Sequence, residues 1–209
     1  MKMDTYIGSF EIRDDWDKEV VMEVVERDEY RRWGDIQINK GDMVLDLGAH
    51  IGSFSRLAAS LGANVVAFEP NPNNFKLLRE NTWDLNVTTR RSAVGVSYEV
   101  NLLVDQDRNE LHKVVDKPSK HTIKVPCVLL DDLISEYGHI DLLKMDIEGS
   151  EYPVLYESKK LDQVKQITME WHYGSSKMAE LIIYLENQGF TTVWLGGNGD
   201  FGKLQLKRL

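Results

Sequence analysis

The run from Val44 to Gly52 constrains this chain more than any other part of the sequence. It reads VLDLGAHIG, a short apolar stretch that leads into a glycine turn. A second apolar stretch follows at 65–68 and ends at an acidic residue, Glu69. A buried strand, a glycine turn at the start of a helix and an acidic residue about twenty positions later are typical of a site for a nucleoside-bearing cofactor.

The number of glycines indicates which cofactor this is. A pyrophosphate needs several backbone amides close by, so dinucleotide sites use three glycines. Here only Gly48 and Gly52 are present. S-adenosylmethionine (SAM) has an adenosine and a methionine tail but no phosphates, and it fits this turn better. The alternative is an ordinary strand-to-helix turn whose glycines only allow close packing.

Each polar group of SAM has a candidate partner in this region. We expect Asp46 to accept a hydrogen bond from the methionyl ammonium and Glu69 to bind the two ribose hydroxyls. The first amides of the helix after Gly48 are expected to face the methionyl carboxylate, helped by the helix dipole.

Composition sets the class of protein. A chain of 209 residues suits one α/β domain that buries its core without disulfides. The net charge of −9 disfavours a dedicated nucleic-acid binder. Cys127 is the only cysteine, and its apolar neighbours favour an inert core thiol. We find no secretory segment at the N-terminus and no apolar run of transmembrane length, so we expect a cytoplasmic protein without a membrane partner.

Apolar runs alternate with helical patterns along most of the chain. We expect strands at 43–47, 64–69, 87–91, 140–146 and 166–171. The intervening helices are expected at 52–61, 72–83, 130–136, 149–156 and 177–188. A glycine-rich turn joins a final pair, 190–195 and 201–206, which predicts a hairpin. This order predicts a mostly parallel sheet with helices on both faces and one antiparallel strand from the hairpin.

Two other regions are less regular. In the N-terminal lead-in, 1–40, we expect a strand or hairpin over 6–13 and a helix over 17–33. Further strands are expected at 98–104 and 122–128. The polar segment between them, 105–121, is interpreted as a surface loop, and the alternative is a substrate lid.

A second dense group of polar residues follows the strand at 140–146. Lys144 and Asp146 point to the same side of that strand. Asp146 lies at its carboxyl end, where open α/β sheets bind ligands. We expect a functional role for Asp146. For Lys144 and Glu151, a structural ion network is an equally good interpretation.

The strand at 166–171 ends in a similar way. Glu170 and His172 share one strand face and are expected beside Asp146 if the two strands are neighbours. Histidine is suited to proton transfer near neutral pH. The alternatives are a hydrogen-bonded surface histidine and a Glu170 that pairs with a lysine. We expect no metal, although Asp146, Glu170 and His172 are the candidate ligands if a divalent ion binds.

Four motifs together resemble one known family. They are 44–52, Phe68-Glu69-Pro70-Asn71-Pro72, the run VLLDDL at 128–133 and the run KMDIEGSEY at 144–152. In order and spacing, from about 43 to 172, the chain is similar to the FkbM family of SAM-dependent methyltransferases. The glycine turn is common to many methyltransferases, and the run at 144–152 is the more specific signal.

The resemblance implies a seven-stranded Rossmann-like sheet and methyl transfer to oxygen. We expect 1–209 to form a single methyltransferase domain with 41–209 as its core, although the lead-in resembles the family only loosely. Acceptors in the family are typically hydroxyls of sugars, glycans, polyketides or other small metabolites. The resemblance also implies cofactor contacts at Asp46, Gly48, Gly52 and Glu69, and adenine-side contacts near Ser92, Ala93 and Val94. We expect five further cofactor contacts: Ala49, His50, Pro70, Asn71 and Asp146. The product would be S-adenosylhomocysteine (SAH).

For catalysis we expect Asp146, Glu170 and His172 to line the acceptor pocket, and Lys144 is a further candidate. Methyl transfer is an in-line displacement, so alignment is the main task of the protein. A base helps because a protonated alcohol is a poor nucleophile, and we expect His172 or Asp146 to receive the proton.

Three other functions remain open at this point. A nicotinamide-dependent oxidoreductase would use Glu69 in the same way but should have a third glycine. A non-catalytic module would bind SAM without consuming it. An RNA methyltransferase is supported only by Arg90, Arg91 and the lysines between 113 and 124, against the acidic total charge. We expect a small-molecule or saccharide acceptor and no nucleic-acid partner, and the sequence specifies no oligomeric state.

Overall fold

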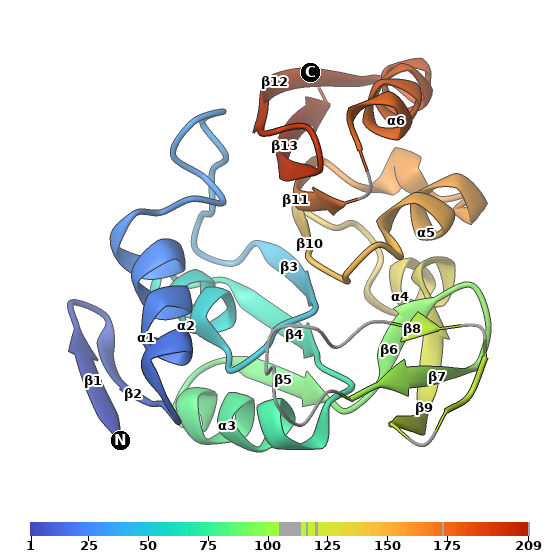
Figure 1. Ribbon diagram of the computed structural model, residues 1–209. Coiled ribbons are helices and arrows are strands. Elements are labelled where there is room, and N and C mark those ends of the chain that lie inside the picture. The colour runs from blue at the N-terminus through green and yellow to red at the C-terminus, as the bar shows by residue number, and fades with distance from the viewer. Residues whose placement is uncertain (105–113, 116, 120, 173, 209) are drawn as a thin grey trace.

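A seven-stranded sheet forms the centre of the computed structural model, which describes residues 1–104, 114–115, 117–119, 121–172 and 174–208 (Figure 1). Its strand order is β12-β13-β11-β10-β3-β4-β5. The strands are β3 (Met43–Leu47), β4 (Asn64–Phe68), β5 (Val87–Arg90), β10 (Leu142–Met145), β11 (Gln166–His172), β12 (Phe190–Gly197) and β13 (Phe201–Arg208). Only β13 runs antiparallel to its neighbours. The predicted seven-stranded, mostly parallel sheet is confirmed.

Helices cover both faces of this sheet because successive strand side chains point to opposite sides. Val44 packs in one cluster with side chains of α2 (Ser53–Ser60). On the same face, Leu78 of α3 (Pro72–Thr82) packs with Ala67 of β4. Leu45 and Leu47 belong to the opposite cluster, which contains α4 (Leu130–Tyr137), α5 (Glu151–Glu157) and α6 (Ser175–Asn187). No helix in the described part of the chain is long and apolar enough to cross a bilayer.

A row of buried polar side chains crosses the α2 face of the sheet. Its members are paired in register on β3, β10, β11 and β13, and they are Asp46, Lys144, Thr168 and Gln205. All four are at most 3% exposed. The Thr168 hydroxyl donates to the Tyr30 carbonyl at 2.6 Å, and the Gly34 amide donates to the Gln205 side chain. The row therefore fixes the irregular chain around Tyr30 onto the sheet.

The lead-in folds differently from the sequence expectation. Its hairpin, β1 (Lys2–Thr5) with β2 (Gly8–Glu11), begins earlier than 6–13. The helix expected over 17–33 was wrong beyond 26: α1 (Asp15–Val21) passes into a π-helical turn, Met22–Glu26, and then into turns. Asp28 and Asp35 have φ of +53° and +57°. These left-handed residues interrupt the helix and let the intervening chain reach the polar row.

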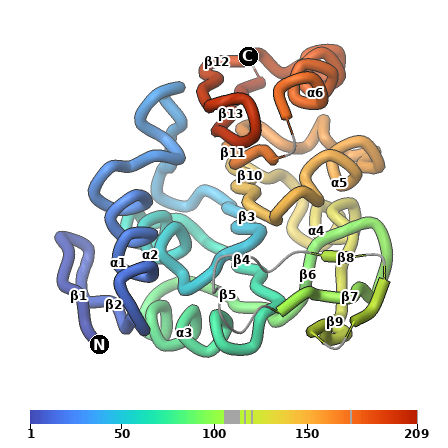
Figure 2. Tube along the Cα trace, viewed as in Figure 1, coloured from blue at the N-terminus to red at the C-terminus, as the bar shows by residue number. Residues whose placement is uncertain are grey.

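A second, four-stranded sheet lies beside the β5 edge of the first, at the lower right of Figures 1 and 2. It contains β6 (Ala93–Gly95), β7 (Glu99–Leu103), β8 (Val114–Val115) and β9 (Thr122–Leu129) in the order β6-β9-β7-β8. The expected strands at 98–104 and 122–128 are therefore confirmed, and Cys127 on β9 is buried as predicted, packed with Ala93 of β6 and Leu102 of β7. Most of the predicted loop, 105–121, lies outside the described residues.

The close approach of two strand ends explains the need for glycine at position 48. Gly48 has φ of +77°, and a Cβ there would lie 1.8 Å from the Asp146 carbonyl oxygen. We expect Gly48→Ala to lower the free energy of unfolding by about 3 kcal/mol or more, because backbone strain adds to a steric clash. Urea denaturation measures this difference.

Gly41→Ala is the matched control. Gly41 has φ of +92°, but a Cβ there meets nothing within 4 Å. This variant should lose only the left-handed preference, about 1 kcal/mol. If both variants lose the same free energy of unfolding, the close contact between the ends of β3 and β10 is not the reason that position 48 needs glycine.

Candidate active site

The glycine turn after β3 is bound to the end of β4. The amides of Gly48 and Ala49 donate to the Phe68 carbonyl at 3.0 and 2.9 Å, and the His50 amide donates to Glu69 Oε2 at 2.9 Å. His50 itself has φ of +52°. The amides of Ala49 and His50, which follow Gly48 and were expected to face a methionyl carboxylate, are thus engaged within the protein. Residues 48–50 form one wall of the pocket described below, and the His50 amide holds Glu69 in place.

Glu69 is held by two backbone amides at the carboxyl end of β4. Oε2 accepts from His50, and Oε1 accepts from the Asn71 amide at 2.8 Å. The side chain is 5% exposed. Burial raises the pKa of Glu69 to about 7, although the two amide hydrogen bonds act to lower it. Asn71 in turn caps α3 through the amides of Asn73 and Asn74.

A buried ion pair lies beneath the turn. Lys144 Nζ is 3.1 Å from Asp46 Oδ1 and donates to the Gly48 carbonyl at 2.7 Å. The Ser55 hydroxyl, from α2, donates to the other Asp46 oxygen at 2.6 Å. Burial alone would lower the pKa of Lys144, but the neighbouring carboxylates of Asp46 and Asp146 outweigh it and raise the pKa. Lys144 therefore stays charged and connects β3, β10 and the glycine turn.

The lead-in is fastened to the same turn. Arg13 makes two hydrogen bonds to the fully buried Asp17, at 2.8 and 2.7 Å. Its guanidinium also lies 3.3 Å from His50 Nε2. Burial lowers the pKa of His50 to about 4 despite the nearby Asp17, so this imidazole is neutral at physiological pH.

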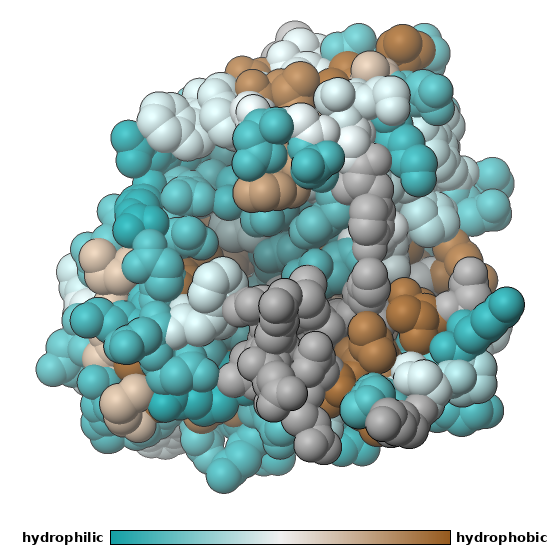
Figure 3. All heavy atoms as spheres, in the orientation of Figure 1, coloured by the Kyte–Doolittle hydropathy of each residue, from teal (hydrophilic) through white to brown (hydrophobic). Residues whose placement is uncertain are grey.

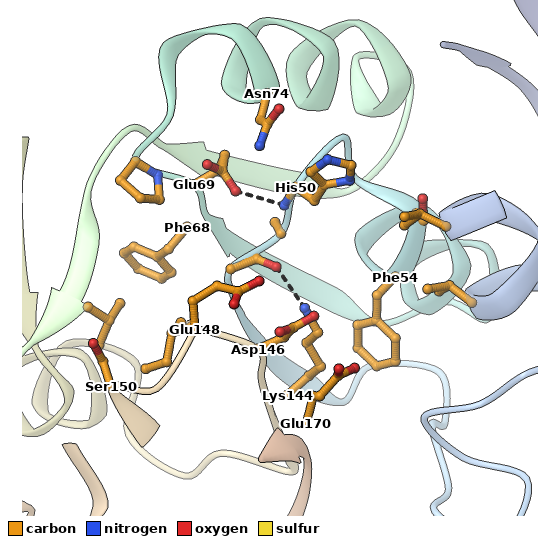
Figure 4. Close-up of a pocket in the computed structure, with 18 of the residues that line it drawn as sticks. His50, Phe54, Phe68, Glu69, Asn74, Lys144, Asp146, Glu148, Ser150 and Glu170 are labelled. Atoms are coloured by element: carbon orange, nitrogen blue, oxygen red, sulfur yellow. Dashed lines mark hydrogen bonds between the residues drawn. The ribbon is translucent and has the colours of Figure 1, made fainter. Parts of the chain in front are cut away.

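One pocket, with a volume of about 480 Å³, extends from this turn across the carboxyl ends of the strands (Figure 4). The predicted site residues that line it are Gly48, Ala49, His50, Glu69, Pro70, Ser92, Ala93, Lys144, Asp146 and Glu170. Four others do not line it: Asp46, Gly52, Asn71 and His172. Each contacts residues that do. Asp46 pairs with Lys144, the Gly52 amide donates to the Ala49 carbonyl, and the Asn71 amide donates to Glu69. His172 lies beside Glu148 and Glu170. Figure 3 shows a hollow on this face with mainly hydrophilic residues visible inside it.

Carboxylates gather at the β10 and β11 end of the pocket. Glu148 and Asp146 point toward one another in Figure 4. His172 Nε2 lies 3.6 Å from Glu148 and 4.0 Å from Glu170, and its Nδ1 lies 3.3 Å from Glu151. The proximity of Glu170 and His172 to Asp146 agrees with the predicted strand neighbours, because β10 and β11 are paired.

Mutual repulsion and burial change the charge states of these groups. Burial and the Asp146 carboxylate raise the pKa of Glu148 to about 8 and that of Glu170 to about 7. Burial alone would lower the pKa of His172, but Glu151 and the other carboxylates raise it to about 9. His172 is therefore protonated at neutral pH, which makes it unsuited to accept a proton there.

Several pocket residues were not singled out from the sequence. Tyr30, from the lead-in, donates to Asp146 Oδ2 at 2.8 Å. Lys203, from β13, pairs with Glu29 at 2.8 Å and with Glu170 at 3.3 Å. Trp16 and Phe201 line the pocket and remain 46% and 50% exposed. These residues belong to no sequence motif, and only the tertiary structure brings them to the strand ends.

The strand order, glycine turn and buried acidic residue define a Rossmann-like methyltransferase. A solved structure with this fold is the fibrillarin of Aeropyrum pernix in complex with natively bound S-adenosyl-L-methionine. It is 11% identical, with a TM-score of 0.52 over 81% of this chain and 67% of that chain. At this identity the likeness concerns the fold alone.

The chain belongs to the FkbM methyltransferase family, because the model of the methyltransferase FkbM domain matches residues 46–192. The 31-O-demethyl-FK506 methyltransferase FkbM of Streptomyces tacrolimicus is 30% identical over 203 residues, covering 78% of each chain. The hexuronic acid methyltransferase AglP of Haloferax volcanii is 31% identical over 149 residues, covering 66% of this chain and 59% of that protein. The predicted family and SAM-dependent methyltransferase activity are confirmed.

The buried pair of Asp46 and Lys144 can be tested through stability. Removing one partner of a buried pair leaves an uncompensated charge, which costs about 3–5 kcal/mol. We expect Asp46→Asn to lower the free energy of unfolding by about that amount in urea denaturation. Glu99→Gln is the control, because Glu99 pairs with Lys124 where both side chains are at least 60% exposed. It should cost less than about 1 kcal/mol. Similar values for both would contradict the supporting role of Asp46.

Proposed function

We propose that this protein transfers the methyl group of SAM to a hydroxyl of a sugar, a glycan or another small metabolite. The observation that carries the proposal is the single pocket that contains both Glu69 and the carboxylates at the ends of β10 and β11. A cofactor on Glu69 and an acceptor beside Glu170 would then face one another across the same cavity, as in-line transfer requires.

The cofactor would occupy the β3, β4 and β6 side of the pocket. Glu69 would accept hydrogen bonds from the ribose hydroxyls, with Pro70 alongside, and Ser92 and Ala93 would contact the adenine. Gly48, Ala49 and His50 would lie against the methionyl part, and Asp146 would border it. Asp46, Gly52 and Asn71 would act indirectly by holding this wall, since they do not line the pocket.

The acceptor would lie at the acidic end, and Glu170 would receive its proton. A base works best when its pKa is close to the working pH, and Glu170, with a pKa of about 7, meets this condition. Protonated His172 would orient Glu148 and Glu170, and Lys144 would hold Asp46 and the glycine turn. This differs from the sequence expectation that His172 or Asp146 receives the proton.

Two features of the pocket support a saccharide or a similar ring as acceptor. Trp16 and Phe201 present exposed aromatic surface to the cavity, and such surface packs well against the apolar face of a ring. The relatives named above carry, in their names, a hexuronic acid in one case and FK506 in the other.

We also propose that residues 1–209 work as one methyltransferase domain. The lead-in, 1–40, contributes Trp16 and Tyr30 to the pocket and is fixed to the turn through Arg13 and Asp17. Removal of the lead-in should therefore impair cofactor binding as well as stability.

The proposed reaction is tested by incubating the protein with radiolabelled SAM and a panel of neutral sugars, uronic acids and hydroxylated macrolides. Transfer of label to one acceptor, with SAH released in equal amount, is the expected result. Tight SAH binding in calorimetry without transfer to any acceptor would favour a non-catalytic module instead.

The role of Glu69 predicts a pH-dependent affinity for SAH. The ionised carboxylate accepts from both ribose hydroxyls, so affinity should rise by up to about tenfold between pH 6 and 8 as Glu69 loses its proton. Glu69→Gln should bind SAH more weakly at pH 8 and lose most of this dependence. Glu80→Gln, at an exposed position on α3, is the control for calorimetry. An unchanged pH dependence in Glu69→Gln would exclude the ribose contact.

The role of Glu170 predicts a change in turnover rather than in binding. At saturating SAM, kcat should rise with pH through about 7 as Glu170 ionises. Glu170→Gln should lower kcat by about 10²–10⁴-fold and remove this limb, with the SAH dissociation constant unchanged. Glu180→Gln on α6, which is exposed, serves as control. If kcat of Glu170→Gln still rises with pH through about 7, a group other than Glu170 receives the proton.

A further inference from the structure

Three side chains at the acidic end of the pocket bring ligand atoms together. Asp146, Glu148 and His172 each offer one such atom, and these atoms lie within 4.8 Å of one another. Ligands of a six-coordinate ion with bonds of about 2.1 Å are about 3 Å apart when adjacent and about 4.2 Å when opposite. Small side-chain rotations are enough to close the set around an ion.

A buried carboxylate orients the histidine of this set. Glu151, from the first turn of α5, is fully buried, and its Oε1 lies 3.3 Å from His172 Nδ1. A histidine that binds a metal almost always donates its other ring N–H to a carboxylate, a carbonyl or water. Here Glu151 lies at Nδ1 and Nε2 faces Glu148, 3.6 Å away, so an ion bound at Nε2 would replace the proton there. The site therefore includes an oriented histidine, which a cluster of carboxylates alone would not provide.

The local charge also favours a cation. Lys203 pairs with Glu29 and Glu170, and Lys144 pairs with Asp46. The carboxylates of Asp146, Glu148 and Glu151 therefore surround one imidazole. Glu151 Oε2 is buried and, among the described residues, has no hydrogen-bond partner. His172, which is protonated at neutral pH, supplies one positive charge to this group, and a divalent cation in place of its proton would supply two.

We propose that Asp146, Glu148 and His172 bind a divalent cation at the acceptor end of the pocket. One nitrogen and two carboxylate oxygens suit an ion such as Mn²⁺, which accepts both ligand types. The set includes Glu148 in place of Glu170, the candidate from the sequence, because Glu170 is held by Lys203. Ion binding itself stands apart from the proposed function, whereas a role in holding the acceptor hydroxyl rests on it.

Manganese binding to the full chain tests the site directly. Chelator-treated protein with SAH bound is titrated with MnCl₂, and free Mn²⁺ is followed by electron paramagnetic resonance. One Mn²⁺ per chain is expected. His172→Ala and Glu148→Gln should each weaken binding at least tenfold, and Glu151→Gln, which changes only the orienting group, by about 10–100-fold. Glu157→Gln, an exposed carboxylate on the same helix, should match the wild type.

Parallel calorimetry with SAH and thermal unfolding separate the possible outcomes. Folded protein that binds SAH but takes up no Mn²⁺ at millimolar concentration would overturn the metal site and leave the proposed function intact. Equal Mn²⁺ affinity in wild type, Glu148→Gln and Glu151→Gln would also overturn it. Binding of an amino sugar at this end without Mn²⁺ uptake would show that the carboxylates neutralise a cationic acceptor. If the folded wild-type protein binds no SAH in calorimetry, that result would instead count against the proposed function.

Discussion

The buried contact between Asp46 and Lys144 is the interaction on which the site depends. Two neighbouring strands place these charges opposite one another, and Lys144 also binds the carbonyl of Gly48. Such a pair contributes little net stability relative to apolar side chains, because desolvation offsets the attraction. Its effect here is geometric. Because Lys144 bonds to both Asp46 and the Gly48 carbonyl, it fixes the position of the glycine turn relative to the ends of β3 and β10, and therefore the shape of the pocket wall.

The same row of polar groups connects the lead-in to the sheet. Thr168 donates to the Tyr30 carbonyl and Gln205 accepts from the Gly34 amide, so two backbone groups of this irregular segment find partners where it lies on the sheet. Tyr30 then reaches Asp146. A chain of contacts thus runs from β13 to the β10 and β11 end of the pocket, and the lead-in becomes part of the site.

The pocket divides into two chemical environments. On the β4 side, one carboxylate is held by two backbone amides, which suits a neutral diol such as ribose. On the β10 and β11 side, several carboxylates surround one imidazole, which suits proton transfer or a cation. The two environments lie at different ends of the same cavity. This separation is what a methyl transfer between a fixed cofactor and a variable acceptor requires.

The sequence by itself determined the sheet, the glycine turn, Glu69 and the family, because these depend on short-range patterns: apolar alternation, a glycine at a crowded turn and motifs of fixed spacing. It also predicted that Asp146, Glu170 and His172 converge, because adjacent parallel strands end at one edge. Only the tertiary structure decided that Asp46 does not line the pocket, that the lead-in helix ends early, and that Tyr30 and Lys203 join the site. These outcomes depend on contacts between residues about a hundred or more positions apart, such as Tyr30 with Asp146, which no local pattern encodes.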